Sequence, residues 1–214
     1  MKLTTYFRST AAYRVRIGLN LKGLDHQLVP VHLLRDGGEH KSEEYLAANP
    51  DGLIPSLETQ GRVLAQSMAI LEYLEEVHPT PSFLPSDPFD RAYLRGIAYN
   101  IICDIHPLNN LRVLQYLTNQ LGANEESKSD WYRNWIDAGF TGIETRLAGS
   151  SHTGACCFGD APTLADVCLI PQVYNAKRFD CPLDDYPTIT RINDHCLSLP
   201  AFAAAAPHVQ ADAE

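Results

Sequence analysis

A proline-rich stretch divides this chain into two parts with different patterns. Residues 79–88, PTPSFLPSDP, contain four prolines. Each proline fixes φ and removes a backbone N–H donor, so a regular helix or strand cannot continue through the stretch. Before it, short segments alternate between period two and helical spacing, and after it helical spacing dominates. We therefore predict an α/β domain at 1–80, a linker at 81–88 and an all-helical domain at 89–214.

The first part is predicted to follow the order β-α-β-α-β-β-α, which is consistent with a thioredoxin-like sheet. Pro30 falls inside the second strand, and a strand that holds proline should lie at the edge of its sheet. Pro55 precedes the third strand in a tight turn, where a cis peptide can occur although trans is the commoner form. The predicted elements are a strand at 3–7, a helix that stops at Gly23, a strand at 26–33, a helix at 43–48, a hairpin of 55–58 with 62–65, and a helix capped by Ser67.

The second part is predicted to be helical throughout. Pro107 interrupts the first run of helical spacing, so the helix should kink or restart near His106. Thr163 and Asp166 form a capping-box pattern that opens a very apolar helix, which should be the core of this domain. The predicted helices lie at 94–108, 111–121, 130–148, 163–179, 187–197 and 200–205, and the final VQADAE is expected to fray.

Charge and apolar content argue against several classes of function. The formal net charge is −9, so neither nucleic acid nor an anionic membrane is expected as the main partner. Hydrophobic residues make up 45%, which argues against global disorder. No apolar run approaches the ~20 residues of a membrane span, and the chain begins with a strand rather than a signal peptide. The six cysteines form no C-x-x-C pair, so we expect reduced thiols, no bound metal and a cytoplasmic protein.

The turn after the first strand carries a distinctive set of polar residues. Arg8, Ser9 and Thr10 lie between the strand and the first helix. Free backbone N–H groups and the helix dipole favour a negative charge at this place. A serine or threonine here is often only a helix N-cap, so two interpretations stand, a cap or a pair of hydroxyls that contact an anionic ligand.

Motifs in both parts of the chain resemble those of zeta-class glutathione transferases. They read RSTAAYRVRIGLNLKG, NPDGLIP, QSMAILEYLEE, DIHPLNNLRVL and GDAPTLADVCLIPQV, and together they extend over essentially the whole chain. The resemblance implies the glutathione transferase fold, an α/β thioredoxin-like N-terminal domain followed by an all-α C-terminal domain. The family commonly has Ser-Ser-Cys at the first turn, whereas this chain has Ser9, Thr10 and Ala11. A mechanism that needs a protein thiol at position 11 is therefore excluded.

The resemblance also implies an activity. It is that of a glutathione-dependent cis-trans isomerase of maleylacetoacetate or maleylpyruvate, working in aromatic catabolism as a homodimer. The cofactor would be glutathione, whose thiolate adds reversibly to the cis double bond so that rotation can give the trans isomer. Two alternatives are a broader glutathione transferase for small electrophiles or α-halo acids, and a non-catalytic binding protein on the same scaffold.

The same resemblance implies which residues would hold glutathione. Ser9 would donate a hydrogen bond to the thiolate, with Thr10 as the second hydroxyl in reach. The backbone beside Ile54 and Pro55 would pair with the cysteinyl unit like an added strand. The start of a helix, with Gln66 and Ser67, suits the γ-glutamyl carboxylate, and His40 and His106 match family positions that contact glutathione. Asn109, near Pro107, is a further candidate, for which polar capping around the kink is the competing interpretation.

The substrates of the family are small acidic molecules of the dicarboxylate type. Arginine binds a carboxylate through two parallel hydrogen bonds, so arginines near the motifs are candidates for substrate binding. Arg8 adjoins Ser9, Arg178 ends the helix that the capping box opens, and Arg112 follows the turn at Asn109. For Arg112, a solvated charge on a helix face is the competing interpretation.

Overall fold

The computed structural model describes residues 1–214 without a gap. It forms two compact units, one made of 1–82 together with 198–214 and the other of 83–197. The packing thus joins the C-terminal residues to the first unit, whereas the sequence pattern grouped them with the helical part. The domain limits 1–80 and 89–214 stay a prediction, because compact packing units need not coincide with domains.

The first unit is built on a four-stranded mixed sheet with the order β2-β1-β3-β4. Strand β1 (Lys2–Thr5) pairs in parallel with β2 (Gln27–Pro30) and antiparallel with β3 (Ser56–Thr59), which pairs antiparallel with β4 (Arg62–Ala65). Two predictions are confirmed here. The strand that ends in proline lies at the edge of the sheet, and β3 and β4 form the hairpin, joined by Gln60 (φ 51) and Gly61 (φ 69). Positive φ at both turn residues matches the twist of the flanking strands.

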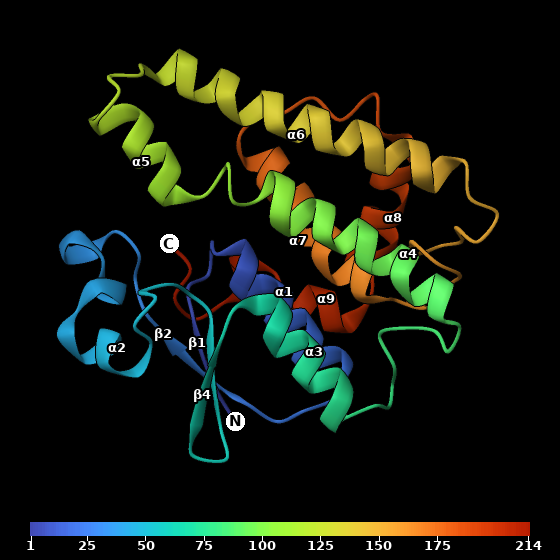
Figure 1. Ribbon diagram of the computed structural model, residues 1–214, viewed down its shortest axis with the longest axis horizontal. Helices are drawn as coiled ribbons and strands as arrows, with labels where there is room; N and C mark the ends of the chain where they lie inside the picture. The colour runs from blue at the N-terminus through green and yellow to red at the C-terminus, as the bar shows by residue number, and fades with distance from the viewer. The chain divides into compact units, whose positions relative to one another are not determined.

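Four α-helices complete the first unit (Figure 1): α1 (Thr10–Leu21), α2 (Glu43–Ala48), α3 (Ser67–Val77) and α9 (Pro200–Ala205). Helix α1 packs against both α3 and α9. Short 3₁₀ turns lie at Arg35–Gly37, Glu39–Lys41 and Pro207–Val209. The core between sheet and helices consists of apolar side chains that are fully buried: Leu3, Val15, Leu19, Leu57, Ile70 and Leu74.

The second unit is helical, as predicted. Its helices are α4 (Pro88–Tyr99), α5 (Leu111–Asn119), α6 (Glu125–Ala148), α7 (Leu164–Arg178) and α8 (Pro187–Leu197). The predicted break near His106 is confirmed, since α4 continues into a π-helical segment, Asn100–Ile105, and then ends in a turn before α5. Helix α7 is buried along most of its length and packs against α4 and α8. The Thr163–Asp166 capping box at its start is present as predicted.

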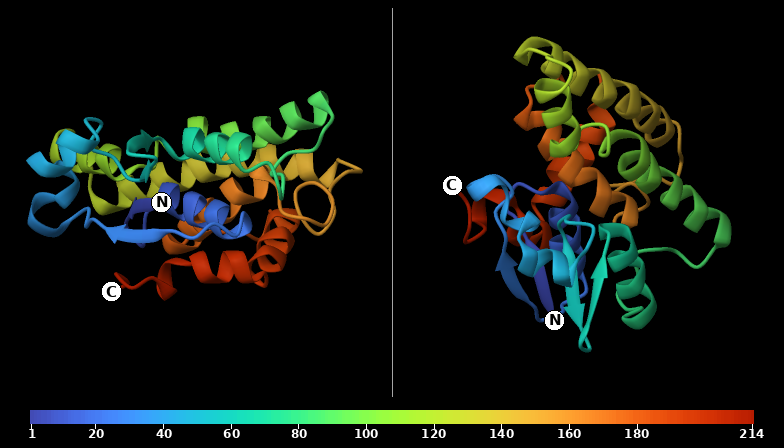
Figure 2. Two further views of the ribbon diagram at one scale, coloured as in Figure 1. Left: turned by 90° about the horizontal axis from the view of Figure 1, so that it is seen from below. Right: turned by 60° about the vertical axis from the view of Figure 1, so that its left-hand side comes forward.

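The C-terminal segment is docked, so the expectation that it frays is wrong. After α9 and the 3₁₀ turn, the chain runs beside the end of β2 (Figure 2), where both belong to the first unit. The side chain of Gln210 is buried, and its Nε2 donates to the carbonyls of Ala204 and Ala206 at 3.0 and 2.9 Å. These hydrogen bonds from the Gln210 side chain hold the segment against the residues just before it. Composition alone does not indicate them.

Candidate functional site

The ends of the strands bring three of the predicted glutathione-binding segments of the first unit to one end of the sheet. Thr4 on β1 pairs with Ser56 on β3, and Ser56 pairs with Ala65 on β4. Strand β1 therefore ends, β3 begins and β4 ends at the same place. The Arg8–Thr10 turn comes after β1, the Ile54–Pro55 peptide directly before β3, and Gln66–Ser67 directly after β4. Segments far apart in the sequence thus meet, because antiparallel pairing places the start of one strand beside the end of the next.

Ser9 is the N-cap of α1. Its Oγ accepts a hydrogen bond from the backbone N–H of Ala12 at 3.2 Å, and its own N–H donates to the carbonyl of Tyr6 at 2.9 Å. A serine hydroxyl has two lone pairs and one proton. Capping uses one lone pair, so the hydroxyl keeps its proton to donate. The two interpretations of this serine are therefore compatible.

The other residues of this turn differ in exposure. Thr10 begins α1 and is 3% exposed, whereas Ser9 is half-buried. Arg8 is also half-buried, and its guanidinium lies over the ring of Phe7, with Cζ 4.8 Å from the ring centroid. No carboxylate of the chain pairs with Arg8. Its charge is therefore available to an anion.

The start of α3 carries a strained residue. Gln66 caps the helix with φ 69 and ψ 115, and Ser67 is the first helical residue. The prediction that Ser67 is the cap is wrong by one position, a shift that sequence patterns at helix ends cannot resolve. A non-glycine residue held at positive φ costs free energy, and such residues cluster at functional sites. Gln66 is exposed, while the Ser67 hydroxyl is buried and accepts from Arg14 Nη1 at 3.4 Å.

The Ile54–Pro55 peptide bond is cis, rather than in the commoner trans form. Ile54 packs in an apolar cluster with Tyr6, Phe7 and Ala12, which places it against the Ser9 turn. Neither the N–H nor the carbonyl of Ile54 takes part in a hydrogen bond of the fold. A buried peptide unit normally has partners, so an extended peptide ligand suits these two groups.

His40 lies in a 3₁₀ turn and is 9% exposed. Burial, with a smaller contribution from the charge of Lys41, lowers the pKa of its imidazole below the ordinary 6.5. Its Nδ1 is buried without a hydrogen-bond partner. A neutral imidazole with an unmatched nitrogen fits a polar ligand, and this orphan atom supports the predicted glutathione contact.

The second unit holds the other four predicted residues. Asn109 is buried and its Nδ2 donates to the carbonyl of Tyr132 at 3.2 Å, while its Oδ1 has no partner. His106 is half-buried in the turn after the π-helical segment. Arg112 is exposed in the first turn of α5. The structure therefore places Asn109 and His106 in one turn and Arg112 just beyond it.

Arg178 ends α7 and is exposed. Its guanidinium lies over the ring of Phe179, with Cζ 4.8 Å from the centroid, and Phe179 stacks on Tyr132 with the centroids 3.8 Å apart. A cation over an aromatic face is attracted by the ring quadrupole. The aromatic pair thus holds Arg178 in place without neutralising its charge. No sequence pattern singled out Tyr132, on α6, or Phe179, at the end of α7, which meet only in the folded chain.

Arg16 is a further supporting residue whose place beside the Ser9 turn the sequence patterns did not identify. It is 1% exposed, and its guanidinium donates to Thr5 Oγ1 at 2.9 Å, to the Phe7 carbonyl at 3.1 Å and to the Ala205 carbonyl at 3.0 Å. Its position one residue after Val15, on the apolar face of α1, was the one available signal. A buried arginine needs several acceptors, and here most are backbone carbonyls near the Ser9 turn.

One group of side chains has the composition of a metal site. The ligand atoms of Cys156, Asp166 and Cys196 lie within 4.8 Å of one another and are buried. The Asp166 carboxylate already accepts from Cys157 N, Thr163 N and Thr163 Oγ1, each at 2.8 Å. Hydrogen bonding with Cys156 and burial raise the pKa of the Cys196 thiol, which disfavours the thiolate that a metal requires. The burial of Asp166 in this group is explained by its role in capping α7.

None of the helices combines the length and apolar character needed to cross a membrane.

Residues 8–77 match the family model of the glutathione S-transferase N-terminal domain. Maleylacetoacetate isomerase of Pseudomonas aeruginosa is 51% identical, covering 99% of this chain and 98% of that protein. The holo structure of a maleyl pyruvate isomerase, described as a bacterial glutathione S-transferase in zeta class, superposes with a TM-score of 0.97 at 45% identity over all of both chains. A maleylacetoacetate isomerase from Methylobacterium extorquens, solved with malonate and glutathione bound, gives 0.95 at 40% identity, again over all of both chains.

Proposed function

The chain belongs to the glutathione transferase family, among the maleylacetoacetate and maleylpyruvate isomerases, and from this premise we propose that it is a glutathione-dependent cis-trans isomerase of one of these two acids. The observation that carries the proposal is the meeting of the Ser9 turn, the Ile54 peptide and the start of α3 at one end of the sheet. Bound glutathione supplies a thiolate that adds reversibly to the cis double bond of the substrate.

Ser9 stabilises that thiolate. Its hydroxyl caps α1 by accepting the Ala12 N–H and keeps its proton to donate to sulfur. The N-terminus of α1 adds the positive end of the helix dipole, and both effects favour the anion over the neutral thiol. Thr10 is less suited to this role, because it is almost fully buried. The alanine at position 11 takes no part in the chemistry.

The remaining groups of the first unit hold the tripeptide. The backbone of Ile54, unpaired in the fold, suits the cysteinyl unit, as one strand pairs with another. The start of α3, with Gln66, Ser67 and the buried Arg14 beside it, suits the γ-glutamyl carboxylate. The orphan Nδ1 of His40 accepts or donates one further hydrogen bond, according to its tautomer.

The substrate is a small acid whose carboxylates are bound by arginine. Arg8 beside Ser9 and Arg178 on its aromatic support both carry charges without a carboxylate partner in the chain. Arg112 is a third candidate, while His106 and Asn109 are proposed as further contacts with glutathione. The relative solved with malonate and glutathione supports a dicarboxylate ligand for this family. We further propose the zeta class, the class of the similar maleyl pyruvate isomerase, and a cytoplasmic homodimer.

The test is isomerisation of maleylacetoacetate and maleylpyruvate with and without glutathione. The wild-type protein should need glutathione, and Ser9→Ala should lower kcat roughly a hundredfold, as loss of a single preorganised donor does. Ser9→Asp is the matched variant, because aspartate keeps the cap but has no proton to donate. Ser9→Asp should therefore be as stable as the wild type, unlike Ser9→Ala, but its kcat should stay low. Activity only towards α-halo acids would favour the broader transferase, and failure to bind glutathione would favour the non-catalytic protein.

A further inference from the structure

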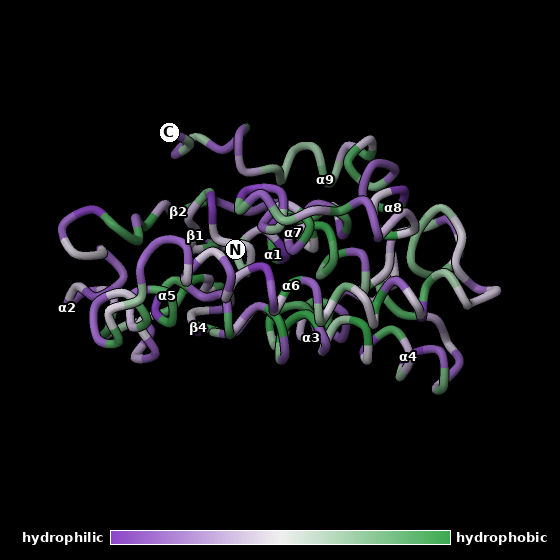
Figure 3. Tube along the Cα trace, turned by 90° about the horizontal axis from the view of Figure 1, so that it is seen from above, coloured by the Kyte–Doolittle hydropathy of each residue, from purple (hydrophilic) through white to green (hydrophobic).

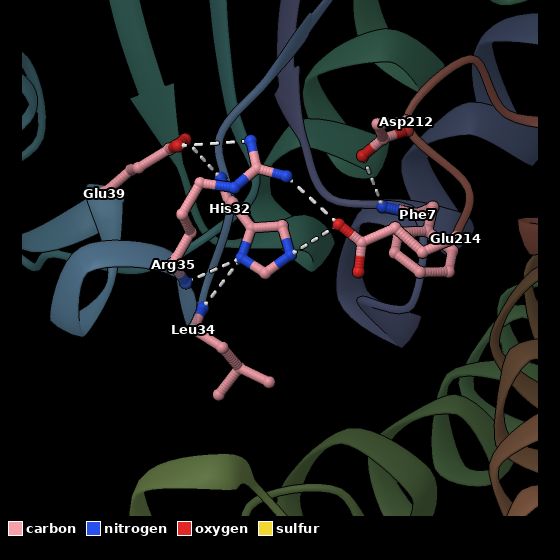
Figure 4. A network of polar contacts seen from close by, with 7 residues as sticks. All are labelled: Phe7, His32, Leu34, Arg35, Glu39, Asp212 and Glu214. Atoms are coloured by element: carbon pink, nitrogen blue, oxygen red, sulfur yellow. Dashed lines mark hydrogen bonds and ion pairs between the residues drawn. The ribbon is translucent and has the colours of Figure 1, made fainter.

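The C-terminal segment, residues 205–214, lies against the turn that carries Ser9. Figure 3 shows that hydrophilic and hydrophobic residues alternate along it, and the segment and the turn belong to the same compact unit. Close by, the Asp212 carboxylate accepts the backbone N–H of Phe7 at 2.9 Å (Figure 4). Phe7 stands two residues before Ser9, and Ser9 N–H closes the turn onto Tyr6. The contact therefore fixes the backbone from which the catalytic hydroxyl projects.

Arg16 joins the same turn to the same segment from the inside. Its guanidinium binds the carbonyls of Tyr6 and Phe7 at 3.4 and 3.1 Å, and its Nε binds the carbonyl of Ala205 at 3.0 Å. The turn is thus held on its carbonyl side by a buried arginine and on its N–H side by Asp212. Charged groups make stronger hydrogen bonds than neutral ones, which suits a position that must not drift.

A second set of contacts reaches the loop before His40. The Glu214 carboxylate pairs with His32 Nε2 at 3.3 Å and with Arg35 Nη2 at 3.1 Å (Figure 4). The Glu39 carboxylate accepts the backbone N–H of His32 at 2.6 Å. Glu214 and Arg35 are half exposed, so their ion pair contributes little on its own. Together with the Asp212–Phe7 bond, these contacts show that the segment touches both the Ser9 turn and the loop before His40.

We propose that the C-terminal segment is part of the catalytic apparatus, with Asp212 as a positioning residue that holds the Phe7–Ser9 turn and so aims the Ser9 hydroxyl at the glutathione sulfur. The inference rests on the proposed role of Ser9. Loss of the Asp212–Phe7 bond lets the turn relax, and the hydroxyl then donates less well to the thiolate. Small displacements of a catalytic group have large effects on rate.

The test compares Asp212→Ala, which removes the acceptor, with Asp212→Asn, which keeps an oxygen in place but removes the charge. The readout is the apparent pKa of the thiol of bound glutathione, followed by the ultraviolet absorbance of the thiolate, together with kcat and KM. We expect Asp212→Ala to raise that pKa and to lower kcat/KM roughly tenfold at neutral pH. Asp212→Asn should lose less than Asp212→Ala, because its neutral oxygen still accepts a hydrogen bond, although a weaker one than the charged carboxylate accepts. The matched control is Asp25→Ala, an exposed carboxylate of the first unit that lies outside the site.

A shortened chain that ends at Gln210 provides a second measurement. It should reproduce Asp212→Ala in both pKa and kcat/KM while its melting temperature confirms that it is folded. An unchanged thiol pKa in Asp212→Ala, or an equal loss in Asp212→Ala and Asp212→Asn, would overturn the inference. Failure of the proposed function is recognised separately, because then the wild-type protein would not lower the thiol pKa of glutathione, or Ser9→Ala would not raise it.

Discussion

Arg14 on α1 donates a hydrogen bond from Nη1 to the hydroxyl of Ser67 at the start of α3, over 3.4 Å. The guanidinium is 1% exposed, so its charge is held away from water. The contact links the helix that Ser9 caps to the helix whose N-terminus faces the proposed γ-glutamyl carboxylate. A buried cation there adds to the helix dipole, and both favour an anion.

Replacement of Arg14 should therefore weaken glutathione binding. Arg14→Met keeps the length of the side chain but removes the charge, and we expect the Kd for glutathione to rise roughly tenfold in calorimetry. Arg14→Lys is the control, since it keeps a positive charge near Ser67 and should lose less affinity. Equal affinity in wild type and Arg14→Met would show that the charge does not act on the ligand.

Gly38 should tolerate no side chain. A Cβ at this residue would lie 2.4 Å from Cε1 and 2.8 Å from Nδ1 of His40, and its φ is +106. We expect Gly38→Ala to destabilise the fold by about 1–3 kcal/mol in urea unfolding, because strain and a clash act together. The variant should also bind glutathione less tightly, because His40 must move.

Gly37 supplies the matched comparison for Gly38. Its φ is +79, but a Cβ there would meet nothing within 4 Å. Gly37→Ala should therefore cost about 1 kcal/mol from backbone strain alone, and glutathione binding should be unchanged. If both variants bind glutathione as the wild type does, the contact of His40 with the ligand is refuted.

Stability should fall at acid pH because of His40. Burial lowers the pKa of this imidazole in the folded protein below the ordinary 6.5 of the unfolded chain. The unfolded state then binds more protons between the two pKa values, so the free energy of unfolding decreases as the pH drops through 6.5 towards the lowered value. Above 6.5 both states are neutral and the effect vanishes.

The measurement is the melting temperature of the wild type and of His40→Asn between about pH 5 and pH 8, the range in which histidine titrates. The wild type should lose more stability than the variant as the pH falls below the ordinary 6.5, and the two curves should run parallel above it. Parallel curves over the whole range would mean that His40 makes no contribution to the acid sensitivity.

Arg178 should act on the substrate and leave glutathione binding unchanged. Arg178→Lys loses the planar fork that binds a carboxylate with two hydrogen bonds, so the KM for the acid should rise roughly tenfold. Phe179→Leu removes the ring over which the guanidinium lies and should give a smaller rise in KM. Arg146→Lys is the control, because Arg146 is also an exposed arginine in the last turn of a helix. It should leave the KM for the acid unchanged. If the KM for glutathione rises together with the KM for the acid, this assignment is contradicted.

The elements of the fold follow from local patterns, which the sequence displays directly. Pro30 marked the edge strand, Gln60 and Gly61 marked the hairpin turn, and Thr163 with Asp166 marked the start of the buried helix. Each of these signals depends on residues within a few positions of one another, where steric and hydrogen-bonding preferences act.

The supporting contacts of the site could not be predicted in the same way. Phe7 and Asp212 are 205 positions apart, and no periodicity connects them. Arg16 could be recognised as a charge on an apolar face, but its acceptors are backbone carbonyls that any residue supplies. The predicted glutathione contacts came from family motifs, and their roles stay predictions until the variants are measured.

The discontinuity of the first unit has a consequence for synthesis on the ribosome. Residues 1–82 emerge first, yet residues 198–214, which complete their packing, follow only after the whole helical unit has been made. Helix α1 lacks its partner α9 throughout this interval, and Arg16 lacks the Ala205 carbonyl. Since domains generally fold as they emerge, we expect the nascent sheet to be formed before the Ser9 turn is fixed, so that residues 198–214 complete the glutathione site only after the helical unit has been made.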